Sequence, residues 1–466
     1  MQNRLYVAVM AAAAAILIYQ LFIPPITGLA DQGDFIRTIR RFGYGPEHGQ
    51  DYLYKYVERK FAPDRAARDR YWEEANSEYP FVAAALLLNK LISKDGKLDI
   101  TVMGLVHMLV FLVVFAYLLR VTARHRAYAL VWILALVVLT DAGYAVYWNS
   151  FYAEPASCIF FLLLLAESVE IAAAGEVRRS QRLLWLLWAI LWVLAKPQNT
   201  AAGLLLALFA FRLAFWVKPG ARAARAIAVA GGCGIIGCAA YNVLAMPKVG
   251  HMANTYGMIF SGILPETKNP AADLVALGLD PQLARYAGSG AWTQNTDFPA
   301  LAESGVLENK VTTFTILRFY VLRPARLWRR LHGVFPVITS LEPPYGNFEE
   351  STGFPPVTLT RGFRLWSNFH AHVLAFSSKW IVFALAVWPA GAVWLWIRNK
   401  DAARRKRIEL SALLPLGCLA ALFGAVFGDA FDLIKHLYLF NLLLDACLIY
   451  AARKVAIILQ QRPAAW

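Results

Sequence analysis

The sequence predicts an all-α polytopic membrane protein with about ten transmembrane helices. Three observations predict this class: hydrophobic residues make up 59% of the 466 residues, the mean hydropathy is +0.47, and apolar stretches of about 20 residues, long enough to cross a bilayer as a helix, recur along the chain. A transmembrane β-barrel would require alternating segments of about ten residues. The apolar runs here, such as 105–119 and 381–397, are continuous instead.

Cysteine usage and charge exclude other classes. The five cysteines all lie in apolar segments and the large polar regions contain none, so neither a disulfide framework nor a cysteine-based metal site is predicted. The net charge of +15 would suit a nucleic-acid partner, but the unbalanced Lys and Arg residues lie in short connections between apolar stretches. Basic residues in such places set the orientation of a membrane protein, so we expect no nucleic acid to bind.

Ten spans are expected, and they cover residues 5–23, 100–120, 127–146, 153–172, 182–195, 199–217, 225–245, 374–397, 408–427 and 433–452. Alternate connections between these spans are rich in Arg and Lys. The two long connections are nearly balanced: 24–79 holds nine Lys and Arg against ten Asp and Glu, and 246–373 holds eleven against nine. The positive-inside rule therefore predicts cytoplasmic termini and an extracytoplasmic location for both long connections.

Two segments affect this topology. Residues 81–92 are apolar but too short to span. Counting them as a span would put every later basic connection outside, so they are predicted to lie on, or dip into, the outer membrane surface as a helix. The N-terminal run resembles a signal peptide with a cleavage sequence at 28–30. Because cleavage would leave Asp31 at a frayed new terminus, an uncleaved first span is expected.

The topology divides the chain into three parts. Residues 1–245 form a transmembrane module that includes the first extracytoplasmic loop, 24–99; residues 246–373 form a small extracytoplasmic domain; and residues 374–466 supply the last transmembrane helices. Prolines interrupt the domain, which predicts short helices joined by irregular segments. Within it, residues 312–335 have the aromatic and basic composition of a surface helix whose arginines bind anionic headgroups, with a substrate phosphate as the alternative ligand.

Four short polar clusters interrupt the apolar sequence, and the predicted topology puts all of them at the outer face. They are Asp31-Gln-Gly-Asp34, Asn149-Ser-Phe-Tyr-Ala-Glu154-Pro, Lys196-Pro-Gln-Asn199 and Gly428-Asp-Ala-Phe-Asp432-Leu-Ile-Lys435-His436. Ionisable groups at membrane depth are costly to bury without a partner. Their convergence on one side of the membrane therefore points to an enzyme.

The candidate catalytic groups are the carboxylates Asp31, Asp34 and Glu154. A carboxylate that is partly desolvated at the mouth of a helix bundle has its pKa raised toward the range that a general base needs. Structural roles are the alternatives. Asp31 or Asp34 would cap a helix over 35–41, and Glu154, followed by Pro155, would be a favourable charge at the start of a helix.

Two of the clusters carry candidate substrate-binding groups. Asn149 and Tyr152 would bond sugar hydroxyls. Lys196, Gln198 and Asn199 connect two spans with almost no loop, so these polar groups are expected at or just below the membrane interface. There Lys196 would neutralise a lipid-linked phosphate, with snorkelling to lipid headgroups as the alternative.

The last cluster also has a functional and a structural interpretation. Asp432, Lys435 and His436 are spaced i, i+3 and i+4 and so share one helix face, which can pair internally or meet an anion such as a lipid phosphate. His370 and His372 have a spacing that suits a metal only in a strand or loop, and no third ligand accompanies them. No metal site is predicted there, and a divalent cation that assists the carboxylates is left open.

These features together resemble the GT-C superfamily of membrane glycosyltransferases. The loop Asp31-Gln-Gly-Asp-Phe-Ile-Arg-Thr-Ile-Arg-Arg-Phe-Gly-Tyr44 is similar to the Asp-x-Gly-aromatic…Gly-Tyr loop of mannosyltransferase-like members. Segments 149–155 and 196–199 look like those of bacterial hexosyltransferases for surface glycans. By this resemblance Asp31 matches the catalytic carboxylate of the first loop, whereas Asp34 falls where many members have an aromatic residue. Which of the two acids is the base is therefore left open.

The resemblance implies a GT-C-like fold in the bacterial cytoplasmic membrane with the site at the extracytoplasmic face. It implies a donor sugar carried on a polyprenyl phosphate, undecaprenyl in bacteria, and transfer with inversion to a glycan, lipid or protein acceptor of the cell envelope. In this scheme Asp31 deprotonates the acceptor while Asp34 or Glu154 orients it. Lys196, Lys435 and His436 are the candidates that face the leaving phosphate.

Two other classes of function are left open. A polysaccharide polymerase or ligase uses similar lipid-linked donors at the same face, but it typically depends on Arg and His in a large outer loop. A transporter or lipid-sugar flippase would place charged residues at mid-depth in interrupted helices of repeated halves. Here the acids cluster at the ends of the predicted spans.

Overall fold

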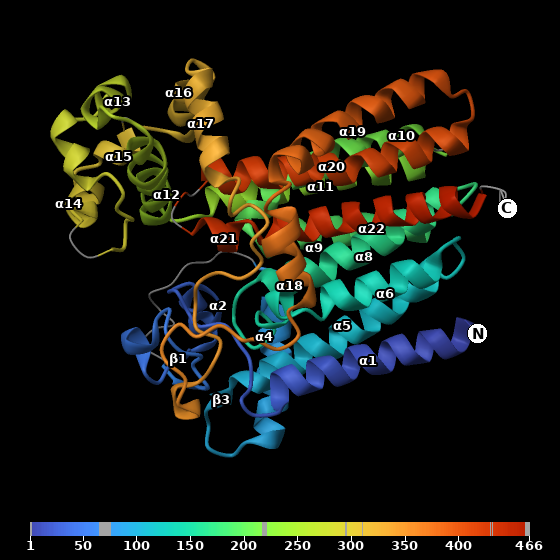
Figure 1. Ribbon diagram of the computed structural model, residues 1–466, viewed down its shortest axis with the longest axis horizontal. Coiled ribbons are helices and arrows are strands. Elements are labelled where there is room, and N and C mark those ends of the chain that lie inside the picture. Colours follow the sequence, from blue (N-terminus) through green and yellow to red (C-terminus); the bar gives the residue numbers. More distant parts are fainter. Residues whose placement is uncertain are drawn as a thin grey trace.

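The computed structural model describes residues 2–64, 76–216, 221–293, 296–309, 311–428, 430 and 432–461. Long helices run in both directions to form a bundle, and shorter elements cover one of its ends (Figure 1). We call this the capped end; it is where α1 finishes at Phe22 and α8 begins at Glu154. The opposite end, where both chain termini lie, is the terminus end (Figure 1).

Among the described residues, seven stretches are long and apolar enough to cross a membrane. They are α1 (Gln2–Phe22), α5 (Ile100–Thr122), α8 (Glu154–Ala173), Pro197–Phe215, which combines η3 (Pro197–Asn199) with α10 (Thr200–Phe215), α11 (Arg222–Leu244), α19 (Ser378–Arg398) and α20 (Ala402–Gly428). Each matches one of the ten predicted spans. The chain is therefore a mostly helical, multi-pass membrane protein.

The other three predicted spans differ from their expected bounds. Span 127–146 is divided into α6 (Tyr128–Leu139) and α7 (Ala142–Ala145), because Asp141 accepts a hydrogen bond from Gly143 N at 3.0 Å and starts a new helix. Span 182–195 is α9 (Arg179–Ala195), and span 433–452 is divided into α21 (Leu433–His436) and α22 (Tyr438–Gln461). All three lie within the bundle (Figure 1), and the count of about ten stays a prediction.

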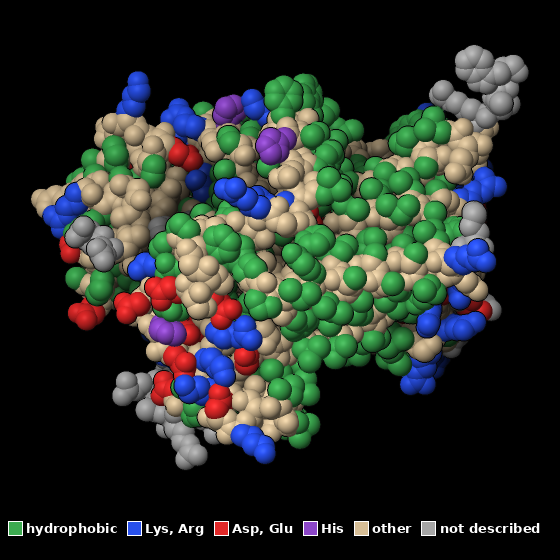
Figure 2. Space-filling model, turned by 60° about the horizontal axis from the view of Figure 1, so that its bottom comes forward, with side chains coloured by type: hydrophobic (Ala, Val, Ile, Leu, Met, Phe, Trp, Pro, Cys, Tyr) green, Lys and Arg blue, Asp and Glu red, His purple; other side chains and the backbone are tan. Residues whose placement is uncertain are grey.

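The surface of the bundle is suited to lipid. Figure 2 shows hydrophobic side chains along the bundle, Lys and Arg at the terminus end, and mixed acidic and basic side chains at the capped end. Large apolar residues on the helices are exposed, among them Val113, Phe215 and Trp380. An apolar surface of this extent would be unfavourable in water but matches the hydrocarbon core of a bilayer.

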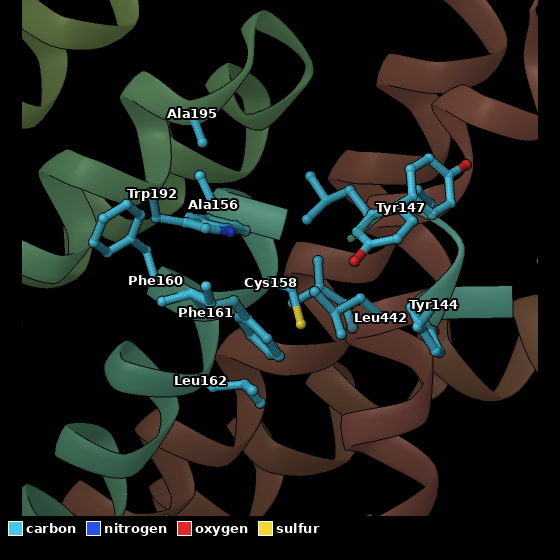
Figure 3. Packing of buried hydrophobic residues seen from close by; sticks show 14 of the residues in the cluster. Tyr144, Tyr147, Ala156, Cys158, Phe160, Phe161, Leu162, Trp192, Ala195 and Leu442 are labelled. Atoms are coloured by element: carbon cyan, nitrogen blue, oxygen red, sulfur yellow. The ribbon is translucent and has the colours of Figure 1, made fainter. Parts of the chain in front are cut away.

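Aromatic side chains fill the interior near the capped end. Tyr144 of α7, Tyr147 just after it, Phe161 of α8 and Trp192 of α9 pack around Cys158 (Figure 3). The ring centroids of Phe161 and Trp192 lie 6.1 Å apart. Buried aromatic rings combine a large apolar area with few rotatable bonds. This core is therefore a rigid support for the polar residues at the capped end.

The first loop adds a small sheet to the predicted all-α architecture. Strands β1 (Tyr44–Pro46), β2 (Lys60–Pro63) and β3 (Leu98–Asp99) pair antiparallel in that order, with Gly45 opposite Ala62 and Phe61 opposite Leu98. The same loop contains the short helices α2 (Phe35–Ile39), η1 (Arg40–Phe42) and η2 (Gly49–Tyr52).

The short apolar segment of the first loop is helical, as predicted. It forms α4 (Tyr79–Ile92), which packs against α5. Phe81 and Ala85 are buried, whereas Leu87 and Leu91 are exposed by 66% and 84%. With one apolar face packed on the bundle and another exposed, α4 has the form of a helix at a membrane surface.

The late segment 345–348 lies between two parts of the first loop. Gly28 N donates a hydrogen bond to Asn347 O at 3.1 Å, Gly346 N donates to Tyr54 O at 2.9 Å, and Val57 N donates to Phe348 O at 2.9 Å. A Cβ atom at position 346 would collide with the backbone carbonyl of Lys55. The segment therefore fits only because residue 346 is glycine.

The predicted loop domain 246–373 is divided in the structure. Its first part has a hydrophobic core of its own, built from α12 (Lys248–Tyr256), η4 (Gly257–Ile263), η5 (Leu264–Glu266), α13 (Pro270–Ala276), η6 (Pro281–Tyr286), α14 (Phe298–Glu303), α15 (Val306–Asn309) and α16 (Thr313–Val321). The second part holds η7 (Glu350–Thr352), α18 (Leu365–Phe369) and η8 (His370–Leu374), and its apolar residues join the main core.

The predicted surface helix over 312–335 consists of two helices, α16 and α17 (Pro324–Val334), because Pro324 starts a new one. Two of its arginines do not face lipid. Arg326 Nη2 donates to Ile263 O at 2.9 Å, and Arg330 forms an ion pair with Glu266 at 3.5 Å. The prediction that these side chains bind headgroups is therefore wrong for Arg326 and Arg330, which bind α17 to the separate core.

We predict that Gly346→Ala lowers the free energy of unfolding by roughly 1–3 kcal/mol, the usual cost of overpacking, because the new methyl group must displace the carbonyl of Lys55. Thermal unfolding in detergent measures the effect. Gly362→Ala is the matched control, since a Cβ there meets no atom within 4 Å. Equal melting temperatures for the two variants would contradict this account of the segment.

Candidate functional site

Residues from all four polar clusters come together at the capped end. Lys435 Nζ donates a hydrogen bond to Asp34 Oδ2 at 2.5 Å, although 401 residues separate them in the chain. Lys196 Nζ donates to Glu154 Oε1 at 2.5 Å. We call the group the carboxylate–lysine cluster; its members are Asp31, Asp34, Glu154, Lys196, Asp432 and Lys435.

Asp31 follows α1 in the first loop and is 8% exposed. Its Oδ1 accepts hydrogen bonds from Gly33 N at 2.7 Å and from Phe35 N at 3.1 Å. Asp31 therefore caps α2, as one structural alternative predicted, whereas Asp34 makes no side-chain capping bond. Within the part of the chain that the structure describes, no hydrogen bond of Asp31 Oδ2 is seen, so this oxygen stays available for a ligand.

Burial raises the pKa of Asp31 to about 6, even though the two backbone N–H groups and Lys435 act in the opposite direction. The negative charge of Asp34 raises it further. A carboxylate with a pKa in this range is ionised near neutral pH and accepts a proton more readily than an ordinary aspartate. This property does not conflict with the capping role, because capping occupies only Oδ1.

Asp34 has the opposite electrostatic character. Burial alone would raise its pKa, but Lys435 and Arg37 hold it well below the usual range. Arg37 Nη1 lies 3.6 Å from Asp34 Oδ1, and Lys196 contributes in the same direction. Asp34 is therefore a fixed negative charge. The two neighbouring aspartates are thus unequal, with only Asp31 able to change protonation near neutral pH.

Glu154 is the first residue of α8 and is 1% exposed. Its Oε1 accepts a hydrogen bond from Lys196 Nζ. Its other oxygen, Oε2, is buried with no hydrogen-bond partner among the described residues. The backbone N–H of Ala156 donates instead to Glu78 Oε2 at 3.2 Å. The first turn of α8 is therefore capped by Glu78, and Glu154 faces the cluster.

Tyr152 connects the cluster to the first loop. Its hydroxyl accepts a hydrogen bond from Gln32 N and donates one to Ala30 O, both at 2.9 Å. Lys435 Nζ lies 5.3 Å from the centre of its ring, a cation–π distance. Tyr152 thus holds the backbone on both sides of Asp31 and also lies beneath the lysine.

Asp432 lies 3.9 Å from Lys435 Nζ and accepts a hydrogen bond from the hydroxyl of Tyr345 at 2.9 Å. Burial raises the pKa of Asp432, and Lys435 opposes this effect. Tyr345 belongs to the late segment that is inserted in the first loop. Asp429, which the sequence also places in this cluster, lies outside the described residues.

The sequence profile of the YfdI N-terminal transmembrane domain family matches residues 2–462. The chain belongs to this family. The match covers nearly the whole chain and agrees with the multi-pass helical bundle described above. No curated protein sequence matches the chain.

Two residues predicted to bind substrate, Asn149 and Asn199, have contacts within the protein. Asn149 is fully buried, and its Nδ2 donates to Leu21 O at 3.0 Å and Thr27 O at 2.8 Å. Asn199 is also fully buried and donates to Ser157 Oγ and Trp192 O. Both amide nitrogens thus bind the protein itself, which gives each side chain a structural role. Their roles as sugar or carrier ligands stay predictions.

Gln198 and His436 are close in sequence to the two lysines of the cluster, Lys196 and Lys435. Gln198 is half-buried, and its Oε1 is a buried atom without a hydrogen-bond partner in the described part of the chain. His436 is 8% exposed and directly follows Lys435 on α21. Their predicted roles toward the carrier phosphate stay predictions.

Sequence reasoning missed the pair formed by Glu78 and His107. Both side chains are fully buried, and His107 Nε2 lies 2.6 Å from Glu78 Oε1. His107 Nδ1 donates to Trp148 O, because a carbonyl can only accept. The one available signal was the position of Glu78 directly before the apolar segment 81–92, comparable to that of Glu154 before its span.

Tyr54 and Tyr345 were missed as well. Their rings lie 5.2 Å apart in an edge-to-face arrangement, and Tyr54 has a φ angle of +63°, which non-glycine residues rarely adopt. The charges of Asp432, Lys435 and Asp34 all act on Tyr54, so it faces the cluster. Only the three-dimensional insertion of segment 345–348 brings these residues together.

The described residues contain no group of three or more His, Cys, Asp or Glu side chains arranged to hold a metal ion. His370 and His372 turn to different environments: His370 is buried against Asp445 at 2.8 Å, whereas His372 is exposed and binds Asn368 O. The two imidazoles therefore make separate contacts within the protein.

We predict that Glu154→Gln and Lys196→Met each destabilise the protein by roughly 3–5 kcal/mol, because each leaves an uncompensated buried charge. The double variant should recover most of that loss, since it removes both charges of the 2.5 Å pair. Thermal unfolding of the four proteins in detergent gives the coupling. Additive losses in the double variant would show that the two side chains do not interact.

Proposed function

We propose that the protein is an inverting glycosyltransferase that moves a sugar from a polyprenyl-phosphate donor, undecaprenyl phosphate in bacteria, to a cell-envelope acceptor. The observation that carries the proposal is Asp31, a buried carboxylate with a pKa of about 6 and one unbonded oxygen beside the fixed negative charge of Asp34. The YfdI-type family, whose members are GT-C-like, supports glycosyl transfer.

In the proposed reaction the acceptor hydroxyl gives its proton to Asp31 Oδ2 as its oxygen attacks the anomeric carbon. The bond from that carbon to the phosphate oxygen breaks, and its electron pair leaves with the carrier phosphate. A general base contributes on the order of 10²–10⁴ to the rate of such a step. The products are the glycosylated acceptor, protonated Asp31 and the free carrier phosphate.

The leaving phosphate gains negative charge, which nearby cations stabilise. Lys435 and Lys196 are the proposed cations, and each is held by a carboxylate at 2.5 Å. These ion pairs fix the position of both ammonium groups before the donor arrives, so little reorganisation is needed during the reaction. The phosphate would share the lysines with Asp34 and Glu154.

Aromatic residues around the cluster suit a sugar. Tyr54, Tyr345 and Tyr152 come from three different segments and surround the lysines and aspartates. Tyrosine rings present apolar faces to the CH groups of a pyranose. We propose that these rings position the transferred sugar, a role that the sequence analysis had given to Asn149 and Tyr152.

The distribution of charge supports an extracytoplasmic site in the cytoplasmic membrane. Lys and Arg gather at the terminus end (Figure 2), which under the positive-inside rule is the cytoplasmic end. The carboxylate–lysine cluster at the capped end would then face the opposite side. Polyprenyl-linked sugars would reach it within the bilayer, and the acceptor glycan, lipid or protein would reach it from outside.

We predict that Asp31→Asn lowers transfer of labelled sugar from a polyprenyl-phosphate donor by at least about 10²-fold, the usual contribution of a general base. Glu154→Gln should reduce transfer less, because it leaves the base intact. The assay uses membranes with equal amounts of each protein. Asp51→Asn, an exposed acid in the same loop, is the matched control, and full transfer by Asp31→Asn would refute the mechanism.

We also predict that kcat/KM falls as the pH decreases through about 6. Below that pH Asp31, whose pKa is raised to about 6, is protonated and cannot accept the acceptor's proton. Asp34 stays ionised over the whole range because its pKa lies far lower. In Asp34→Asn the acidic limb should move to lower pH, since the charge of Asp34 raises the pKa of Asp31. An unchanged limb in this variant would assign the titration to another group.

A further inference from the structure

A large cavity lies inside the bundle, away from the carboxylate–lysine cluster. Its volume is about 590 Å³, within the range of roughly 300–1,000 Å³ that is usual for ligand sites. Its walls are formed mainly by Ala, Val, Leu and Phe side chains of α5, α6, α8, α10, α20 and α22, together with Trp192 of α9. No member of the cluster lines it, so it requires a separate explanation.

One end of the cavity is closed and the other is open. Phe161, Trp192 and Leu442 lie at the closed end, within the aromatic core (Figure 3), and all three are buried. Gly175 and Ala403 line the cavity at the terminus end and are exposed. The cavity therefore opens where the bundle meets its basic surface.

The open end is positively charged. Arg407, Arg453 and Lys454 line it, and Arg407 and Lys454 are exposed. Asp445 is the acid among the described lining residues, and its two oxygens are taken by His370 at 2.8 Å and by the hydroxyl of Tyr144 at 2.6 Å. The acid inside the cavity is thus already paired. At the opening, Arg453 Nε donates to Arg126 O at 3.1 Å and Lys454 Nζ lies 5.2 Å from the centre of the Tyr450 ring, so neither cation is neutralised by a carboxylate in these contacts and both keep their positive charge for an external anion.

We propose that the cavity binds one anionic phospholipid of the bilayer, with a hydrocarbon chain inside and the phosphate against Arg407, Arg453 and Lys454. Apolar cavities do not hold water well and take apolar ligands instead. Lys and Arg at a membrane surface attract anionic headgroups. A lipid therefore matches both the walls and the opening, whereas a soluble peptide would have to enter at the level of the bilayer.

The polyprenyl donor is a different ligand at a different place. The lysines proposed for its phosphate lie at the capped end, whereas the cations of the cavity lie at the terminus end. The phospholipid would fill the space between α20 and α22 on one side and α5, α6 and α8 on the other. A ligand that binds only the folded protein stabilises it, so the lipid should act as a structural component.

The test uses the purified full chain in detergent, with phosphatidylglycerol or phosphatidylcholine added. We expect one tightly held phosphatidylglycerol per chain by native mass spectrometry, a melting temperature that rises with phosphatidylglycerol, and roughly tenfold weaker binding of phosphatidylcholine. Equal binding of the two lipids, or displacement of phosphatidylglycerol by polyprenyl phosphate, would overturn the proposal.

Two variants with matched controls separate this site from general lipid contact. Ala446→Phe places a ring in the cavity and should abolish the single tight binding, whereas Ala451→Phe, on the same helix but outside the cavity, should not. Arg407→Ala with Lys454→Ala should weaken phosphatidylglycerol binding roughly tenfold, and Arg398→Ala with Arg404→Ala should leave it unchanged. If both test variants bound the lipid like their controls, the assignment would be wrong.

Discussion

The structure at the capped end depends on pairing charges that are removed from water. Lys435 is 2% exposed, and a lysine at that depth is tolerated only with a close counter-charge. Asp34 supplies it at 2.5 Å and Asp432 lies within 3.9 Å. Asp34 belongs to the first loop, whereas Asp432 and Lys435 lie near the C-terminal end of the chain. The requirement for pairing therefore also fixes the position of the first loop on the last helices.

The same constraint differentiates the two aspartates of the first loop. Cations hold the pKa of Asp34 well below its usual range. Burial raises the pKa of Asp31, whose hydrogen bonds within the described residues involve only Oδ1, to about 6. Identical side chains three residues apart thus acquire different chemical properties from their surroundings.

Much of the fold was predictable, because apolar stretches of membrane length and the distribution of Arg and Lys follow directly from the bilayer. The convergence of Asp34, Glu154, Lys196 and Lys435 followed from the same topology. The roles of Asn149 and Asn199 were not predictable, since an amide that bonds a sugar and an amide that bonds a buried carbonyl look alike in sequence. Tyr345 was missed because its position depends on segment 345–348, whose insertion has no local signature.

The insertion of segment 345–348 between Gly28 and Val57 has a consequence for biosynthesis. The first loop emerges early during translation, yet the N–H groups of Gly28 and Val57 and the carbonyl of Tyr54 bond to residues made roughly 300 positions later. Until that segment arrives, the polar face of the loop is incomplete. The polar cap is therefore assembled only after most helices have entered the membrane, so Asp31 acquires its buried surroundings only when the bundle beneath it exists.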